Sequence, residues 1–126
     1  MPNKVFINND GFEEMVFEGV IDLEAVKKII SASFEFDNKL AEKSDYIDTI
    51  IDLSAATDMT EEAMTASFEG FKATHYDLIA IYGANPQVAE QMNQAIVKAA
   101  VGFKVKLFDT REAATTWLKE ASHPGQ

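Results

Sequence analysis

Residues 46–63, with the sequence YIDTIIDLSAATDMTEEA, decide the fold of this chain. The segment Tyr46–Leu53 is rich in isoleucine, and runs of β-branched residues are typical of a buried strand. The polar segment Ser54–Met59 predicts a short turn, and a helix is predicted from about Glu61 to Ala73. Open α/β sheets bind their ligands just beyond the carboxyl end of a strand, so this turn is the first candidate for a functional site.

Two short strands are predicted near the amino terminus, over Lys4–Asn8 and Phe12–Glu18. The intervening Asn9-Asp10-Gly11 suits a hairpin turn, because Asn and Asp tolerate the left-handed backbone conformation and Gly adopts it readily. Gly19 is predicted to end the second strand. The two strands are therefore expected to be antiparallel neighbours.

A long amphipathic helix is predicted next. Asp22 is a natural N-cap, and the helical pattern extends as far as Lys43. Its apolar side is expected to contain Leu23, Val26, Ile29, Ile30, Ser33, Phe34, Phe36 and Leu40. The helix predicted after the central turn can be capped by Asp58 or Thr60. Its inward side is expected to contain Met64, Ser67, Phe68, Phe71 and His75.

The segment Tyr76–Tyr82 is apolar on both faces, which is typical of a central parallel strand covered on both sides. Asn85 and Pro86 predict the start of the third helix, as its N-cap and its first residue. Gly102 is predicted to end that helix. Its buried face is expected to contain Val88, Met92, Ala95, Ile96 and Ala99.

A last strand is predicted over Phe103–Phe108, where apolar and polar residues alternate. Lys104 and Lys106 are expected to face solvent, which indicates an edge strand. Asp109 is the predicted cap of the final helix. The inward side of this helix is expected to contain Ala113, Ala114, Trp117, Leu118 and Ala121.

These elements predict an α/β fold with the order β-β-α-β-α-β-α-β-α, in one domain over residues 1–126. Alternating strands and helices form right-handed crossovers and a parallel sheet. The expected architecture is therefore a mixed, mostly parallel sheet of about five strands with four helices, which begins with an antiparallel hairpin. A flavodoxin-like fold, which begins β-α, is the second choice.

Composition excludes several classes of function. The net charge of −10 arises from 21 acidic and 11 basic residues and leaves no basic surface for nucleic acid or for an anionic membrane. No apolar run approaches the ~20 residues that cross a bilayer, and the first residues lack the apolar segment of a secretory signal. The chain has no cysteine, which is compatible with the cytoplasm. We expect a cytoplasmic protein with neither a nucleic-acid partner nor membrane insertion.

Acidic residues around the central turn are the candidates for acid–base catalysis: Asp52, Asp58, Glu61 and Glu62, with His75 nearby in sequence. No nucleophile elbow, HExxH, P-loop or GxGxxG motif accompanies them. Metal binding through Asp52, Asp58 and Glu61 is not expected, because one short turn seldom supplies enough ligands. The sequence therefore predicts a non-enzymatic protein without a cofactor or metal.

Two segments resemble a known family: IIDLSAATDMTEEAM at 50–64 and VKLFDTREAATTWL at 105–118. Together with the order of elements, they resemble the STAS, or SpoIIAA-like, domains over nearly the whole chain. The resemblance implies the SpoIIAA-like fold and a regulatory role through protein binding. The ending with Phe-Asp, Glu-Ala and Trp-Leu is more similar to an uncharacterised branch of that family.

In the anti-sigma-factor antagonists of the family, a partner kinase phosphorylates a serine at a helix start. Aligned on Asp52-Leu53-Ser54, that motif falls on Thr60-Glu61-Glu62-Ala63, and Glu61 takes the position of the serine. The resemblance therefore leaves Thr60 as the remaining candidate phosphoacceptor. Glu61 either mimics a phosphate or simply complements the positive end of the helix dipole.

Protein–protein interaction around this strand-to-helix junction is the favoured class of function. Acidic residues beside methionines suit an interface with a polar rim and an apolar centre. The candidate partner or regulatory site contains Ser54, Thr57, Asp58, Met59, Thr60, Glu61, Glu62 and Met64. The partner is either another protein or a second copy of this chain, which would dimerise through the first helix.

A small apolar, lipid-like ligand is the alternative. Phe and Met are concentrated on the first two helices, and together these side chains suit an adaptable pocket. The candidate pocket contains Phe34, Phe36, Met59, Met64, Phe68 and Phe71. Ordinary packing of a core is the competing explanation for these residues.

Overall fold

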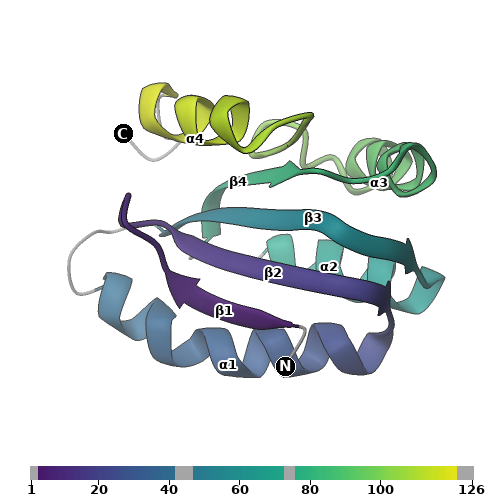
Figure 1. The fold of residues 1–126 in the computed structure, drawn as a ribbon, viewed down its shortest axis with the longest axis horizontal. Coiled ribbons are helices and arrows are strands. Elements are labelled where there is room, and N and C mark those ends of the chain that lie inside the picture. The colour runs from purple at the N-terminus through teal and green to yellow at the C-terminus, as the bar shows by residue number, and fades with distance from the viewer. Residues whose placement is uncertain (1–2, 42–46, 73–75, 122–126) are drawn as a thin grey trace.

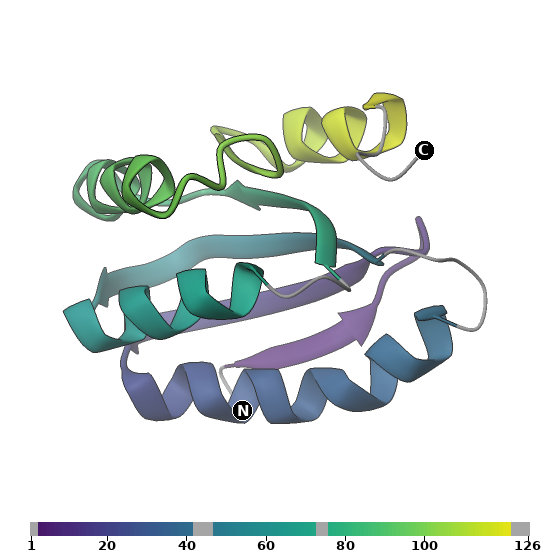
Figure 2. The same ribbon diagram turned by 180° about the vertical axis from the view of Figure 1, so that it is seen from behind.

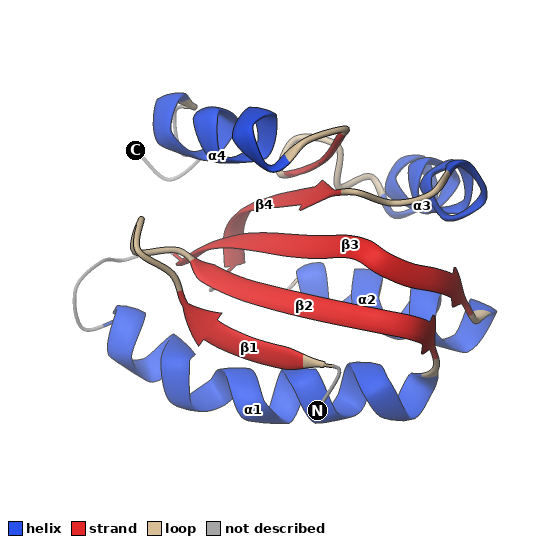
Figure 3. Cartoon of the chain, in the orientation of Figure 1, coloured by secondary structure: helices blue, strands red, loops and turns tan. Residues whose placement is uncertain are grey.

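The structure is a computed structural model that describes residues 3–41, 47–72 and 76–121, with only the backbone of residues 35–41 and 76. Within these ranges five strands and four helices follow the predicted order (Figure 1, Figure 3). They are β1 (Lys4–Ile7), β2 (Glu13–Ile21), α1 (Leu23–Ala41), β3 (Ile47–Met59), α2 (Glu61–Phe71), β4 (Tyr76–Tyr82), α3 (Pro86–Ala99), β5 (Val105–Phe108) and α4 (Arg111–Glu120).

The strands form one sheet in the order β1-β2-β3-β4-β5. β1 and β2 are antiparallel and the later pairs are parallel, which confirms the predicted mixed sheet. In the hairpin, Asn8 Oδ1 accepts hydrogen bonds from the backbone N–H groups of Asp10 and Phe12, at 2.9 and 3.1 Å. Gly11 completes the turn with a φ of +84°, which a residue with a side chain rarely adopts.

The helices cover the two faces of the sheet unequally (Figure 1, Figure 2). α1, α2 and α3 lie on one face, where their apolar side chains join those of the strands in the larger core. α4 lies on the other face, where Ala114 and Leu118 join Ile50, Leu78 and Ala80 in a smaller core. The sheet therefore separates two apolar clusters, and the larger one lies below three helices.

β3 is longer than predicted, and the turn predicted at Ser54–Met59 is wrong because this segment is part of the strand. Ala56 and Met59 are buried, whereas the polar side chains between them are exposed. Pairing with β2 extends the strand until Met59 lies opposite Ile21. Gly19, predicted to end β2, instead lies within it at a bulge, with a φ of +67°.

At three helix ends, the structure shows which of several nearby residues is the cap. Thr60, one of two predicted candidates, is the N-cap of α2. Thr110 caps α4, so the prediction of Asp109 was wrong by one residue. α3 ends at Ala100, in the left-handed conformation, so the prediction that Gly102 ends this helix was wrong by two residues. Adjacent polar or small residues look equivalent in the sequence, and the backbone path decides which of them becomes the cap.

Lys104 was predicted to face solvent but is only 6% exposed. A turn in which the Lys104 N–H donates to the Val101 carbonyl precedes β5 and shifts the alternation, so that Phe103 is exposed instead. Burial lowers the pKa of the Lys104 amine, and the nearby Asp77 carboxylate opposes this effect. Lys106, which lies within β5, is exposed as predicted.

Candidate functional site

A groove between α2 and α3 contains half of the predicted partner site. Met59, Thr60, Glu61 and Met64 line this groove, which has a volume of about 490 Å³. Met59, Met64 and Phe68 are buried and form its apolar floor. Exposed polar and charged side chains on its rim include Glu61, Thr65, Glu69, Gln91, Gln94 and Lys98.

One side chain fixes the amino-terminal end of the groove. Asn85 Oδ1 caps α3 by accepting the Val88 N–H at 2.9 Å, which confirms the predicted N-cap. Asn85 Nδ2 donates to the Thr57 carbonyl at 3.1 Å. The start of α3 is therefore attached to β3 just before α2 begins. Because both helices follow parallel strands of one sheet, they run in the same direction along the groove.

Charge changes sign along the groove. Glu61 and Glu62 are exposed in the first turn of α2, where the helix dipole favours negative charge. At the other end, Lys98 lies in the last turn of α3, and Lys72 follows α2 with its ammonium 3.5 Å from the Glu69 carboxylate. The amino end of the groove is therefore acidic, and its carboxyl end carries two lysines.

The remaining predicted partner residues lie outside the groove lining. Thr57 and Asp58 are exposed at the end of β3, and Glu62 is exposed on α2. Ser54 is on the α4 side of the sheet, where its hydroxyl donates to Asp52 Oδ1 at 2.6 Å. The structure therefore distributes the predicted set between the groove, the end of β3 and the opposite face.

The residues predicted to form an apolar pocket are also divided. Phe68 and Phe71 pack edge to face with ring centroids 5.1 Å apart, but Phe68 lines the groove and Phe71 lines an interior cavity. Met59 lines both spaces and Met64 only the groove. Phe34 is 55% exposed on α1. The side chain of Phe36, the sixth member, lies outside the described residues.

The predicted acid–base residues are likewise separated. Asp52 lies on the α4 side of the sheet, whereas Glu61 lines the groove on the opposite side. His75 and His123 lie outside the described residues. In the part of the chain that the structure describes, no three His, Cys, Asp or Glu side chains are grouped closely enough to hold a metal ion. None of the described helices is long and apolar enough to span a bilayer.

A polar cluster on the α4 side of the sheet was missed by the sequence analysis. Arg111 Nη1 donates to Glu14 Oε2 at 2.6 Å and to the Tyr82 hydroxyl at 3.4 Å. The almost wholly buried Glu14 carboxylate also accepts from Asn8 Nδ2 at 3.0 Å. The Tyr82 hydroxyl is hydrogen-bonded to Asp52 as well. The cluster thus connects α4 with β2, β3, β4 and the hairpin.

The electrostatics of this cluster favour a structural role. Burial raises the pKa of the Tyr82 phenol, so that it stays neutral, and the hydrogen bond from Arg111 opposes this effect. The hydrogen bond to Glu14 raises the pKa of the Arg111 guanidinium. Arg111 is the only arginine in the chain, and this is the one feature of the sequence that points to the cluster. Its partners are 97 and 29 residues away, so no local spacing reveals them.

Comparison with known proteins agrees with this architecture. A sequence model of the SpoIIAA-like family matches residues 14–119. No curated protein sequence matches the chain. An uncharacterised DUF3478-family protein from Shewanella loihica PV-4, with a SpoIIAA-like fold, is 15% identical; the match covers 92% of this chain and 91% of that one, with a TM-score of 0.62. The unphosphorylated anti-sigma factor antagonist SpoIIAA is 12% identical to this chain. The match covers 94% of this chain and 99% of that one, with a TM-score of 0.63.

Proposed function

The chain belongs to the SpoIIAA-like family, and we propose that it is a non-enzymatic module that binds a protein partner in the α2–α3 groove. SpoIIAA, which shares the fold, is an anti-sigma factor antagonist and so acts on another protein. The proposal describes a single cytoplasmic domain, residues 1–126, that needs neither cofactor nor metal.

The composition of the groove carries this proposal. Its buried floor of Met59, Met64 and Phe68 is surrounded by polar and charged side chains, as in protein interfaces with an apolar core and a polar rim. Methionine side chains are flexible and adapt to the shape of a partner. The volume of about 490 Å³ is sufficient for several side chains from one partner segment.

Charge specifies the orientation of the partner. Glu61 lies at the amino end of the groove and Lys98 at the carboxyl end. Complementary potentials across an interface fix register and favour the correct partner. The favoured partner segment is therefore basic where it meets the start of α2 and acidic where it meets the end of α3.

Site-specific photo-crosslinking in cells of the source organism tests the proposal. A photoreactive amino acid at Thr65 or Gln94, both exposed on the rim, is expected to trap one discrete partner. The same amino acid at the exposed Thr116 of α4 serves as the control. Ala95→Arg is expected to abolish the crosslink by filling the groove, whereas Ala113→Arg, at an exposed position of α4, should preserve it. The same crosslinked product in equal yield from the rim positions and the control position would contradict binding in the groove.

A second copy of the chain is the alternative partner. In that case the crosslinked product has twice the mass of the chain, and the mass measured by light scattering increases with concentration. Dimerisation through α1 makes a different prediction, because it would persist in Ala95→Arg and be lost when the exposed Phe34 is replaced by serine.

Phosphorylation of Thr60 is a second candidate mode of regulation, favoured by the exposed position of this hydroxyl at the N-cap of α2. A phosphate there would lie at the positive end of the helix dipole. Thr60→Ala removes both the phosphoacceptor and the cap, whereas Thr60→Asn removes only the phosphoacceptor, because Asn caps helices equally well. Phosphate incorporation from a cell lysate should be lost in both variants. Labelling that persists in either variant would exclude Thr60.

A further inference from the structure

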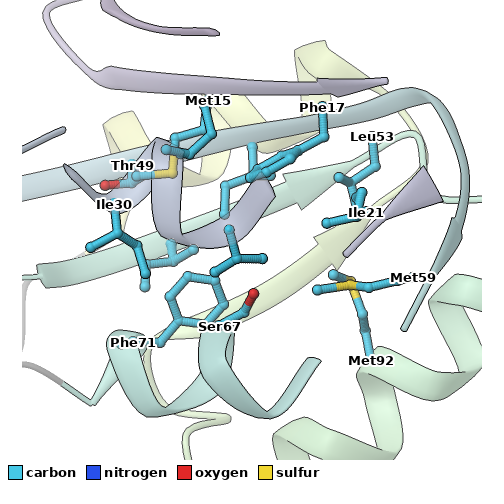
Figure 4. A pocket seen from close by; sticks show the side chains of 15 residues that line it. Met15, Phe17, Ile21, Ile30, Thr49, Leu53, Met59, Ser67, Phe71 and Met92 are labelled. Carbon is cyan, nitrogen blue, oxygen red and sulfur yellow. The ribbon is translucent and has the colours of Figure 1, made fainter. Parts of the chain in front are cut away.

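An apolar cavity lies inside the molecule, between the sheet and helices α1 and α2 (Figure 4). Its volume is about 40 Å³. On the sheet side it follows the successive inward-facing residues Thr49, Ile51 and Leu53 of β3, beside Met15 and Phe17 of β2. The lining therefore extends along two neighbouring strands. It is separate from the α2–α3 groove, with which it shares only Met59 among the described lining residues.

Thr49 provides a hydrogen-bonding group in this lining. Its side chain is 1% exposed, and its Oγ1 has no hydrogen-bond partner among the described residues. A buried hydroxyl without a partner is unfavourable. A bound water needs about two to four polar partners, but Thr49 and Ser67 are the only polar side chains among the described residues of the lining. A guest with one polar group and an apolar body therefore fits this cavity better than water.

The way in lies between α1 and α2. Among the described residues of the lining, Ile30, Ser67 and Gly70 are partly exposed and the others are buried. All three lie on these two helices. A Cβ atom at Gly70 would contact Ile30 Cδ1 at 3.8 Å, an ordinary van der Waals distance. The absence of a side chain at Gly70 thus leaves space between the two helices above the cavity.

The lining restricts the chemistry of the guest. Thr49 and Ser67 are the only polar side chains among its described residues. A charged guest group would lose its hydration in the cavity without enough hydrogen-bond partners to replace it, which is costly. We infer that the cavity binds a neutral, unbranched aliphatic alcohol, with its chain along the strands and its hydroxyl hydrogen-bonded to Thr49 Oγ1.

The size of the guest is set by how far the lining can move. The cavity of about 40 Å³ is much smaller than the ~150 Å³ that accommodates benzene in an engineered cavity. Met15, Met59 and Met92 line it, and these unbranched side chains can change rotamer without moving the backbone. Short alcohols therefore bind first, and longer ones bind as the methionines are displaced.

NMR titration of methyl-labelled protein with n-butanol, n-hexanol and n-octanol tests the inference. Saturable shifts are expected at Ile29 and Ile51 but not at Leu118, which belongs to the core below α4. Affinity should increase about fourfold for each added methylene until the cavity is full. The matched carboxylate n-octanoate should bind on the order of tenfold more weakly than n-octanol. Unsaturable shifts, or equal affinity for the two, would overturn the inference.

Variants at Thr49 and Gly70 locate the site. Thr49→Val keeps the shape but removes the hydroxyl, so n-hexanol binding should weaken roughly fivefold while n-hexane binding stays unchanged. The midpoint of thermal unfolding of this variant should rise, because an unpaired buried hydroxyl is lost. Gly70→Leu closes the space between α1 and α2 and should abolish binding, whereas Gly70→Ala should preserve it. Full n-hexanol affinity in Thr49→Val or in Gly70→Leu would overturn the proposed site. Ala95→Arg, which changes the groove and not the cavity, should leave n-hexanol affinity unchanged.

Discussion

Ala100 ends α3 in the left-handed region, with a φ of +57°. This conformation costs a residue with a Cβ atom about 1–2 kcal/mol and costs glycine almost nothing. Ala100→Gly is therefore expected to raise the free energy of unfolding by about 1 kcal/mol, as measured with urea. Ala99→Gly, one residue earlier and inside the helix, should lower it by about the same amount. Changes of the same sign in both variants would contradict a left-handed cap at this position.

Tyr82 makes stability depend on alkaline pH. Burial raises the pKa of its phenol in the folded state, with Arg111 opposing and Asp52 adding to the effect. Because the folded-state pKa is above the unfolded value of about 10, the contribution is complete below that pH. It is lost as pH rises through the folded-state pKa. Tyr82→Phe cannot titrate, so its unfolding free energy should decline less steeply above about pH 10. Parallel pH profiles of the two proteins would disprove this coupling.

At the level of elements, ion pairs of unequal burial attach α4 to other described parts of the chain. Arg111 binds the buried Glu14 at 2.6 Å, whereas Lys119 binds the more exposed Asp10 at 2.9 Å. Arg111→Gln should lower the free energy of unfolding by about 2 kcal/mol, because Glu14 loses a charged donor. Lys119→Gln should cost less than about 1 kcal/mol. Adding Glu14→Gln to Arg111→Gln should restore part of the loss. Equal losses in the two single variants would argue against a role for burial.

Helices and strands whose ends carry residues typical of turns or helix caps could be predicted from the sequence. Asn9-Asp10-Gly11 marked the hairpin, and Asn85-Pro86 marked the start of α3. The carboxyl half of β3 could not be predicted, because Ser54–Met59 has the composition of a turn and becomes a strand through pairing with β2. The apparent alternation from Phe103 was misleading for a related reason, since a turn before β5 directs Lys104 inward.

Only those residues of the candidate site that are close together in the sequence could be predicted as a group. Met59 to Met64 form a continuous strand-to-helix junction, so their proximity follows from the sequence alone. Gln94 and Ala95 enter the same groove from another helix, which only the packing of α3 on the sheet reveals. The ion pair of Glu14 and Arg111 could not be predicted for the same reason, because 97 residues separate the two side chains in the sequence.

For the whole molecule, the two cores raise the question of whether α4 unfolds separately. Trp117, the only tryptophan, packs in the smaller core with its ring centroid 5.6 Å from that of Phe108. Its fluorescence therefore reports α4, whereas far-ultraviolet circular dichroism reports all the helices. If residues 1–126 form one domain, both signals should give the same urea midpoint. A lower midpoint for Trp117 fluorescence would show that α4 detaches first and would contradict a single cooperative unit.

The order of strands in the sheet repeats their order along the chain. Each described strand after β1 therefore pairs with the strand made just before it, across one turn or one helix. Contacts between segments close in sequence form quickly, because little loop entropy is lost when they meet. During synthesis on the ribosome the sheet can grow strand by strand, and each new strand covers the edge left by its predecessor. The isoleucine-rich β3 is then an open edge only briefly, which limits the time available for pairing with another nascent chain.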